Sequence, residues 1–208
     1  FLGEIVYKDN TVSDDDVLVK QINYFTNDDN FNETVYDYRG NPQYSTMISK
    51  LCSYTKRSEF IIDVIKNELK IFPEQQIMIL AQNKNLLKYL HDTIYERNIA
   101  SVGYYVGGMK ETELKNSETK KIIVATFAMA AEGLDIKTLS TLLMATPRTD
   151  ITQSVGRILR IKHKRPLVID IVDSHDIFKR QWKKRVSFYK KKKYKIISTT
   201  NTNYYNNI

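Results

Sequence analysis

The sequence predicts an α/β protein built on a doubly wound parallel sheet. Short runs of consecutive apolar residues recur along the middle of the chain, and stretches with apolar residues at helical spacing separate them. Continuously apolar strands that alternate with helices are typical of a parallel sheet covered on both faces. The 208 residues, of which 42% are hydrophobic, suffice for one such core with a flanking segment at each end.

The first 72 residues contain two kinds of pattern. Residues 1–44 mix short β-like runs, such as 17–22, with turns rich in Asn and Asp, which predicts a connector or accessory β segment. From Ser45 to about Phe72 the apolar residues recur at helical spacing, with Ser58 as a candidate N-cap and Pro73 as a stop. We therefore expect a helix before the first buried strand.

Residues 45–173 are predicted to form the main domain. The expected helices are 85–97, a short one near Met129, and 150–160, and the expected strands are 77–81, 102–106, 122–125, 139–145 and 167–172. In such sheets, ligands bind where the carboxyl ends of the strands meet the helix N-termini. The loops after Ala81, Val106, Ala125 and Ala145 are therefore the expected location of the chemistry.

Residues 174–208 are predicted to form a basic, aromatic helix followed by a frayed tail. The net charge is +8, and Lys and Arg crowd this end of the chain, which indicates a polyanionic partner or a solvated surface. The aromatic residues Trp182, Phe188, Tyr189 and Tyr194 lie among the cations. They can stack on bases or dock the helix on the domain, and the sequence leaves both readings open.

Composition excludes several classes of site. The single cysteine, Cys52, cannot form an internal disulfide, and the three scattered histidines show no metal-ligand spacing, so no metal site is expected. No apolar run is long enough to span a membrane, so no membrane partner is expected. The chain begins with Phe1 and shows no signal peptide pattern, which suggests an intracellular fragment of a longer protein.

The most informative segment is 153–160, which reads QSVGRILR. Arg157 and Arg160 are three residues apart and therefore share one helical face. Two guanidinium groups on one face can neutralise the charge of a phosphoryl group during transfer. On spacing alone, the segment also fits a surface helix with two solvated arginines.

A second segment, 125–136, follows a predicted strand. It places the hydroxyl of Thr126, the glycine Gly133 and the carboxylate of Asp135 in a loop and the first turn of a helix. A hydroxyl and backbone N–H groups at a helix N-terminus can hold a phosphate. The alternative is a strand–turn–helix in which Gly133 merely ends a short helix.

Together these two segments resemble motifs V and VI of superfamily 2 helicases, and 77–83 resembles motif IV. The resemblance covers about residues 60–173 and implies the second RecA-like domain of such a motor. It implies that Arg157 and Arg160, with Gln153 beside them, face the γ-phosphate as catalytic residues, and that Gly133 and Asp135 lie near the nucleotide. ATP with Mg²⁺ would be held mainly by an N-terminal RecA-like domain of the same polypeptide.

The resemblance also implies nucleic-acid contacts. Thr126 and the loop of Gln82, Asn83 and Lys84 match family positions that bind the phosphate backbone. Residues 105–111 are similar to the loop after the second strand in helicases of large DNA viruses and phages, which adds Gly107, Gly108 and Lys110. Gly103 to Lys110 is no P-loop, because Met109 separates Gly108 from Lys110 and no Ser or Thr follows.

These observations predict the C-terminal motor domain of an ATP-dependent superfamily 2 DNA helicase or translocase, inactive on its own. Gln153 and Ser154 stand where DEAD-box RNA helicases carry His and Arg, which favours DNA without excluding RNA. The alternatives are a double-stranded DNA translocase, an RNA helicase of transcription, a non-catalytic nucleic-acid-binding module, and a nucleotide-sugar domain of a glycosyltransferase. If the protein is viral, the expected location is the host cytoplasm or the virion.

Overall fold

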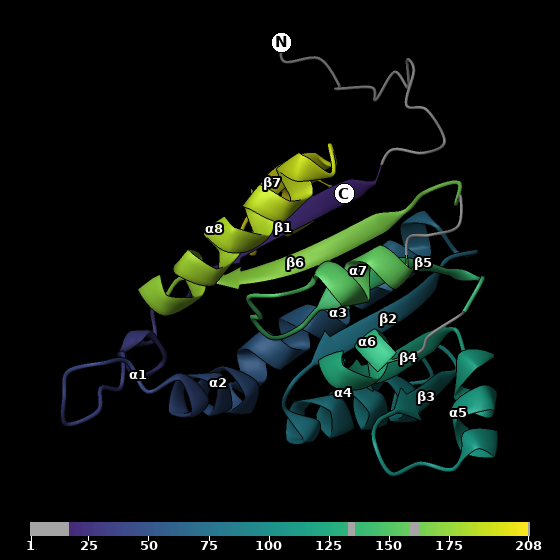
Figure 1. The fold of residues 1–208 in the computed structure, drawn as a ribbon, viewed down its shortest axis with the longest axis horizontal. Coiled ribbons are helices and arrows are strands. Elements are labelled where there is room, and N and C mark those ends of the chain that lie inside the picture. The colour runs from purple at the N-terminus through teal and green to yellow at the C-terminus, as the bar shows by residue number, and fades with distance from the viewer. Residues whose placement is uncertain (1–16, 133–135, 159–162, 208) are drawn as a thin grey trace.

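One parallel sheet runs through the whole protein. The computed structural model describes residues 17–132, 136–158 and 163–207, without the side chains of 156–158 and 206–207. The seven strands lie in the order β3-β4-β2-β5-β6-β1-β7, and neighbouring strands are parallel (Figure 1). Their bounds are β1 Leu18–Tyr24, β2 Gln76–Ala81, β3 Val102–Tyr105, β4 Ile122–Thr126, β5 Leu139–Met144, β6 Leu167–Asp173 and β7 Lys195–Thr200.

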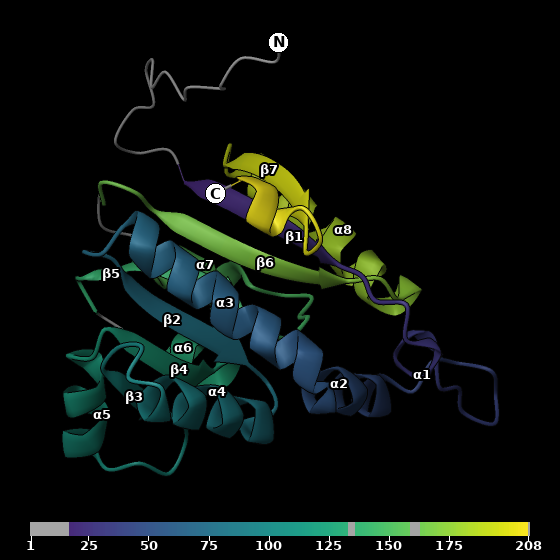
Figure 2. The ribbon, with the colours of Figure 1, turned by 180° about the vertical axis from the view of Figure 1, so that it is seen from behind.

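Helices cover both faces of the sheet, so the predicted doubly wound fold is confirmed. Every residue of β2, β5 and β6 is buried, as a strand between two helical layers requires. One face is covered by α2 Tyr44–Ser53, α3 Thr55–Ile71 and α4 Lys84–Glu96 (Figure 2). The other face is covered by α6 Phe127–Glu132, α7 Thr152–Ile158 and α8 Asp176–Lys191 (Figure 1).

The structure also describes three short helices: α1 Asp29–Asn32, α5 Glu111–Glu118 and the 3₁₀ helix η1 Tyr204–Asn207. Phe31 of α1 and Tyr204 of η1 belong to the core on the face that α3 covers. The sequence did not predict α5, because Ser117 is its one buried residue and the helix shows no apolar periodicity. Within the described parts of the chain, every helix is too short or too polar to span a bilayer.

The helix predicted near Ser58 begins earlier and is divided. Tyr54 is extended, with φ −82° and ψ 99°, and separates α2 from α3. Because α3 starts at Thr55, Ser58 lies inside the helix, where it is buried, and the prediction of Ser58 as the N-cap was wrong. The end of α3 at Ile71, two residues before Pro73, agrees with the predicted stop.

The sheet continues across the predicted boundaries at residues 44 and 173. Strand β1, from the presumed connector, lies between β6 and β7 and pairs with both. Strand β7 forms the sheet edge, so the expectation of a frayed tail was wrong for residues 195–200. The predicted basic helix is present as α8.

Candidate nucleotide and nucleic-acid interface

The carboxyl edge of the sheet gathers the predicted site loops. In the register of β2 with β4, Ala81 lies opposite Thr126. In the register of β2 with β5, Leu80 lies opposite Met144, and the Ala145 N–H donates to the Leu80 carbonyl at 2.9 Å. The loops that follow β2, β4 and β5 therefore start at the same level of the sheet.

Gln82 makes hydrogen bonds inside the protein that hold the carboxyl edge of the sheet together. Its backbone N–H donates to Oγ1 of Thr146 at 3.1 Å, and its side-chain amide donates to the hydroxyl of Tyr44 at 2.8 Å and to the Pro147 carbonyl at 3.3 Å. The Tyr44 hydroxyl donates to the same carbonyl at 3.1 Å. The Gln82 side chain thus ties α2 to the loop after β5 and is already engaged inside the protein.

Asn83 and Lys84 differ from Gln82 in their surroundings. The Asn83 side chain accepts a hydrogen bond from the Leu86 N–H at 3.0 Å and so caps the N-terminus of α4. Lys84 opens the helix and is exposed. Of the three predicted contacts in this loop, Lys84 therefore presents its side chain most openly to a ligand.

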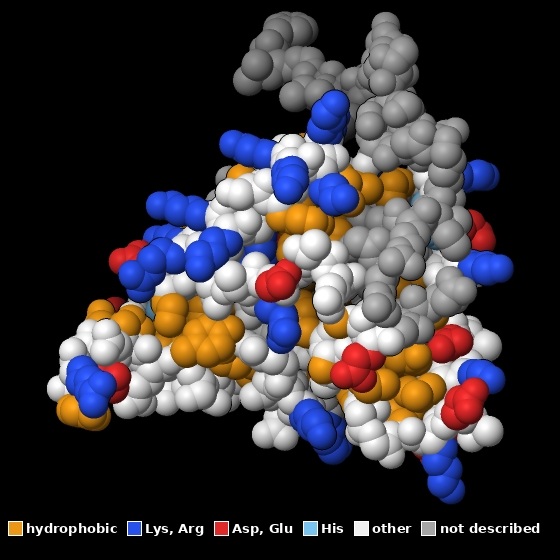
Figure 3. Space-filling model, in the orientation of Figure 1, with side chains coloured by type: hydrophobic (Ala, Val, Ile, Leu, Met, Phe, Trp, Pro, Cys, Tyr) orange, Lys and Arg blue, Asp and Glu red, His pale blue; other side chains and the backbone are white. Residues whose placement is uncertain are grey.

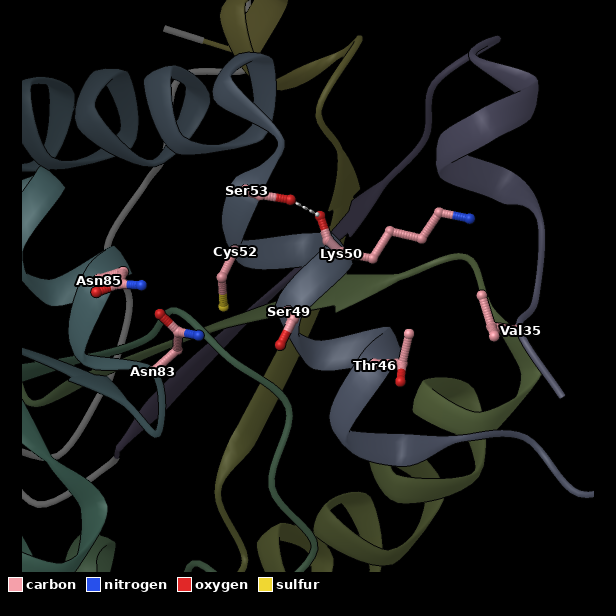
Figure 4. A pocket seen from close by; sticks show the side chains of 8 residues that line it. All are labelled: Val35, Thr46, Ser49, Lys50, Cys52, Ser53, Asn83 and Asn85. Carbon is pink, nitrogen blue, oxygen red and sulfur yellow. Dashed lines mark hydrogen bonds between the residues drawn. The ribbon is translucent and has the colours of Figure 1, made fainter. Parts of the chain in front are cut away.

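A pocket lies between α2 and the start of α4 (Figure 4). Ser49, Cys52, Asn83 and Asn85 are among its lining residues, and their side chains point toward a common space. Lys50 borders the pocket, but its ammonium donates to the Glu33 carbonyl at 2.7 Å. Burial raises the pKa of the Cys52 thiol to about 11, so it stays protonated at neutral pH. The pocket lining is therefore mainly apolar, with a few amides and hydroxyls.

Thr126 stands at the junction between β4 and α6. Its Oγ1 accepts a hydrogen bond from the Met129 N–H at 3.4 Å, and the residue is half-buried. The next residue, Phe127, is buried, and the guanidinium of Arg148 lies over its ring at 5.2 Å from the centroid. Two further predicted residues, Gly133 and Asp135, lie outside the described residues.

Helix α7 packs against α6, so the segments predicted as motifs V and VI are neighbours. The Asp150 carboxylate accepts a hydrogen bond from the Thr152 N–H at 3.0 Å, and this bond lowers the pKa of Asp150. Val155 is buried on the domain, whereas Gln153 is exposed. Arg157 belongs to α7, but its side chain is not described, and Arg160 lies outside the described residues.

The loop after β3 is open to solvent. Gly107, Gly108 and Lys110 are exposed, and Gly108 has a φ of +90°, a conformation that favours glycine. Gly103 differs, because a Cβ at that position would lie 2.8 Å from the Ser117 hydroxyl. Close packing of β3 on α5 therefore explains Gly103, which agrees with the rejection of a P-loop.

Sequence reasoning missed the role of Arg185, which sits in the basic segment but is buried. Its guanidinium bonds the Asp170 carboxylate at 2.7 and 2.8 Å and the Arg148 carbonyl at 2.6 Å. It thereby joins α8 to β6 and to the loop that precedes α7. The available signal was Asp170 itself, because a carboxylate inside a fully buried strand requires a partner.

Several known proteins with related sequences come from viruses. No family model matches the chain. It is 36% identical over 203 residues to "Putative ATP-dependent RNA helicase L396" of Acanthamoeba polyphaga mimivirus, covering 94% of this chain and 39% of that protein. It is 25% identical over 172 residues to "Putative helicase 161L" of Invertebrate iridescent virus 6, covering 75% of this chain and 38% of that protein. The chain thus spans less than two fifths of either relative.

Solved structures share the fold. The crystal structure of T4 UvsW superposes with a TM-score of 0.67 at 20% identity and covers 91% of this chain and 42% of that chain. The C-terminal domain of the DEAD-box protein Dbp5 superposes with a TM-score of 0.56 at 16% identity and covers 88% of this chain and 91% of that domain. The chain is therefore a homologue of proteins named as helicases in large DNA viruses, and it has the fold of the second RecA-like domain of superfamily 2 helicases.

Proposed function

We propose that this chain is the C-terminal motor domain of an ATP-dependent superfamily 2 DNA helicase or translocase. It would supply arginine fingers to ATP and Mg²⁺ held by a preceding RecA-like domain, and it would grip the backbone of nucleic acid. The observation that carries the proposal is the meeting of three predicted segments at the carboxyl edge of the sheet: the 82–84 loop, Thr126 with α6, and α7. In parallel sheets this edge is where ligands bind.

The proposed nucleotide side is formed by α7 and the segment after α6. Gln153 is exposed at the start of α7, and Arg157 lies four residues further along the same helix. Arg157 and Arg160 would neutralise the charge that develops on the γ-phosphoryl group, and Gly133 and Asp135 would lie near the nucleotide.

The proposed nucleic-acid side is a row of three loops. Strands β3, β4 and β2 are consecutive in the sheet. Gly107, Gly108 and Lys110 follow β3, Thr126 ends β4, and the 82–84 loop follows β2. Neighbouring strands are about 4.8 Å apart, so the row spans about 10 Å. One strand of nucleic acid that crosses the row would meet all three loops through its phosphates, without sequence preference.

The choice of DNA rests on Gln153 and Ser154 in the predicted motif VI. An RNA helicase is the second candidate, because the mimivirus relative is named as one. A double-stranded DNA translocase would use the same loops and the same arginine pair. For a protein with viral relatives, we propose the host cytoplasm or the virion as its location.

Mutation of the arginine pair in the full-length protein tests this proposal. Arg160→Ala should lower the kcat for ATP by roughly 10³-fold or more, and Arg157→Ala should lower it less, while affinity for nucleic acid persists. Lys56→Ala, at an exposed position on α3, is the control and should leave kcat unchanged. The 208-residue chain alone should not hydrolyse ATP. Unchanged turnover in both arginine variants would overturn the assignment of motif VI.

A further inference from the structure

The solvent-facing side of α8 is almost purely cationic. The exposed residues of α8 include Lys179, Arg180, Lys183, Lys184, Lys190 and Lys191, and the exposed Lys192 and Lys193 follow its end; together we call these residues the basic face. Asp176 is the one acidic residue of the helix. Figure 3 shows Lys and Arg side chains gathered over the region where Figure 1 places α8. A surface that serves solubility alone normally mixes charges of both signs.

Most cations of the basic face have no carboxylate partner among the residues that the structure describes. Lys179 lies 3.9 Å from the Asp176 carboxylate. Among the carboxylates of the described residues, none lies within 4.0 Å of the side-chain nitrogens of the other cations of the face. Their charge is therefore available to an external anion.

The end of α8 keeps a lysine where the backbone favours glycine. Lys193 has a φ of 60°, and hydrogen bonds from Lys193 N–H to the Lys190 carbonyl and from Tyr194 N–H to the Tyr189 carbonyl close the helix. Helix α4 ends with the same pair of bonds but carries Asn98, with a φ of 50°, at this position. A lysine in this conformation costs about 1 kcal/mol. The chain thus accepts strain at a position where the side chain extends the basic face.

The aromatic residues of α8 point inward. Phe178 and Tyr189 are fully buried, and Trp182 and Phe188 pack against the core cluster on this side of the sheet. The rings of α8 are thus buried or half-buried, and the basic face presents mainly cations. Contacts of this kind suit the phosphates of a duplex, whose bases are already stacked.

We propose that the basic face of α8 binds the sugar-phosphate backbone of duplex nucleic acid. From Lys179 to Lys191 the helix rises about 18 Å, a length over which a duplex carries about ten phosphates. Helix α8 begins after the carboxyl end of β6 and ends before the amino end of β7. Because the strands are parallel, the helix therefore runs from the carboxyl ends of the strands to their amino ends. A duplex along α8 would extend away from the row of loops proposed to hold a single strand. This inference rests on the proposed function, because it takes the partner to be nucleic acid.

A matched pair of triple variants of the 208-residue chain tests the inference. The first replaces Arg180, Lys183 and Lys184 by Gln, and the control replaces Lys56, Lys66 and Lys70 of α3, on the opposite face of the sheet, by Gln. Both sets of residues are exposed, both variants lose three positive charges, and Gln has nearly the helix propensity of Lys and Arg. Thermal melts establish that both fold. Fluorescence anisotropy over a salt series then measures binding to a 20-base-pair duplex and to a 20-nucleotide single strand.

The α8 variant should bind the duplex at least roughly tenfold more weakly at low salt, with a salt slope shallower by up to about 2.7, whereas the control should match the wild type. If both variants lost the same affinity for the duplex, the loss would come from the change in net charge rather than from the basic face, and the proposal would be overturned. A larger loss for the single strand than for the duplex would overturn the assignment to duplex. If the wild type binds the single strand but the α8 variant keeps its duplex affinity, the inference about α8 alone fails. If the wild type binds neither, the proposed function fails as well.

Discussion

Arg185 and Asp170 form a bidentate ion pair between α8 and β6, with Nε 2.7 Å and Nη2 2.8 Å from the two carboxylate oxygens. Both residues are buried, and the Tyr189 hydroxyl donates to the same carboxylate at 3.0 Å. A third donor of Arg185, Nη1, reaches the Arg148 carbonyl at 2.6 Å. The pair therefore holds α8 in place and also fixes the loop that leads into α7.

Arg185→Met should destabilise the protein by about 3–5 kcal/mol, because it leaves the Asp170 carboxylate buried without its counter-ion. Urea denaturation of the 208-residue chain measures the loss. The control is Arg97→Met, which breaks an ion pair with Glu59 at the surface and should cost much less, because water solvates both groups there. Equal losses for the two variants would contradict a buried pair between α8 and β6.

Gln82 and Lys84 should respond to mutation in opposite ways. Gln82→Ala removes the amide that joins Tyr44 to the Pro147 carbonyl, and it should lower the free energy of unfolding by about 1–2 kcal/mol. Lys84→Ala should leave the stability unchanged, because the side chain is exposed, and should flatten the salt dependence of single-strand binding by about 0.7. Urea melts and anisotropy on both variants separate the two roles. A stable Gln82→Ala with lost binding would show that Gln82 is a ligand residue rather than a brace.

The central strands could be predicted from the sequence because their pattern needs no knowledge of their partners. Strands β2, β5 and β6 are buried throughout and are mostly apolar, although β5 contains Ser140 and Thr141 and β6 contains Asp170. Strand β7 is half exposed and lies in a polar tail, so only its pairing with β1, far away in the sequence, makes it a strand. A pattern along the chain cannot report such long-range pairing.

The location of the candidate site could also be predicted, since it follows from the edge at which parallel strands end. The surroundings of its side chains could not. Gln82 resembles a free polar loop residue until Tyr44 is brought to it by the packing of α2. Arg185 resembles the solvated cations around it until the face of α8 that meets the sheet is known. The contacts of Gln82 depend on tertiary packing alone, whereas Arg185 shares the helical spacing of the buried Phe178 and Tyr189, and that signal was overlooked among the surrounding cations.

Gly107→Ala tests the loop after β3. No atom lies within 4 Å of a Cβ built at Gly107, so the fold should tolerate alanine there, with stability unchanged or higher by about 0.4–1 kcal/mol. If a phosphate approaches this backbone closely, the added methyl group should weaken single-strand binding, as measured by anisotropy. Gly108→Ala is the comparison and should be destabilised by about 1 kcal/mol, because its φ of +90° disfavours alanine. Unaltered binding by Gly107→Ala would remove this loop from the proposed interface.

Glu59 provides a prediction for pH. Its carboxylate accepts hydrogen bonds from Arg97 at 2.7 and 2.8 Å and from the Tyr89 hydroxyl, and these bonds lower the pKa of Glu59 from 4.5 to about 2. Because the folded pKa lies below the unfolded one, the stabilisation is complete above pH 4.5 and is lost as the pH falls through about 2.

Glu59→Gln removes the titrating carboxylate but keeps the size of the side chain. The melting temperature of the wild type should therefore exceed that of Glu59→Gln by a constant amount from neutral pH down to about 4.5, and the difference should shrink between pH 4.5 and 2. Glu74→Gln, at an exposed position after α3, changes the net charge equally and serves as the control for general charge effects. If the control shows no matching change between pH 4.5 and 2, the change in melting temperature over that range can be assigned to Glu59. A difference between wild type and Glu59→Gln that stays constant down to pH 2 would show that Arg97 and Tyr89 do not hold this carboxylate in solution, and that the contact between α3 and the end of α4 is looser than its hydrogen bonds indicate.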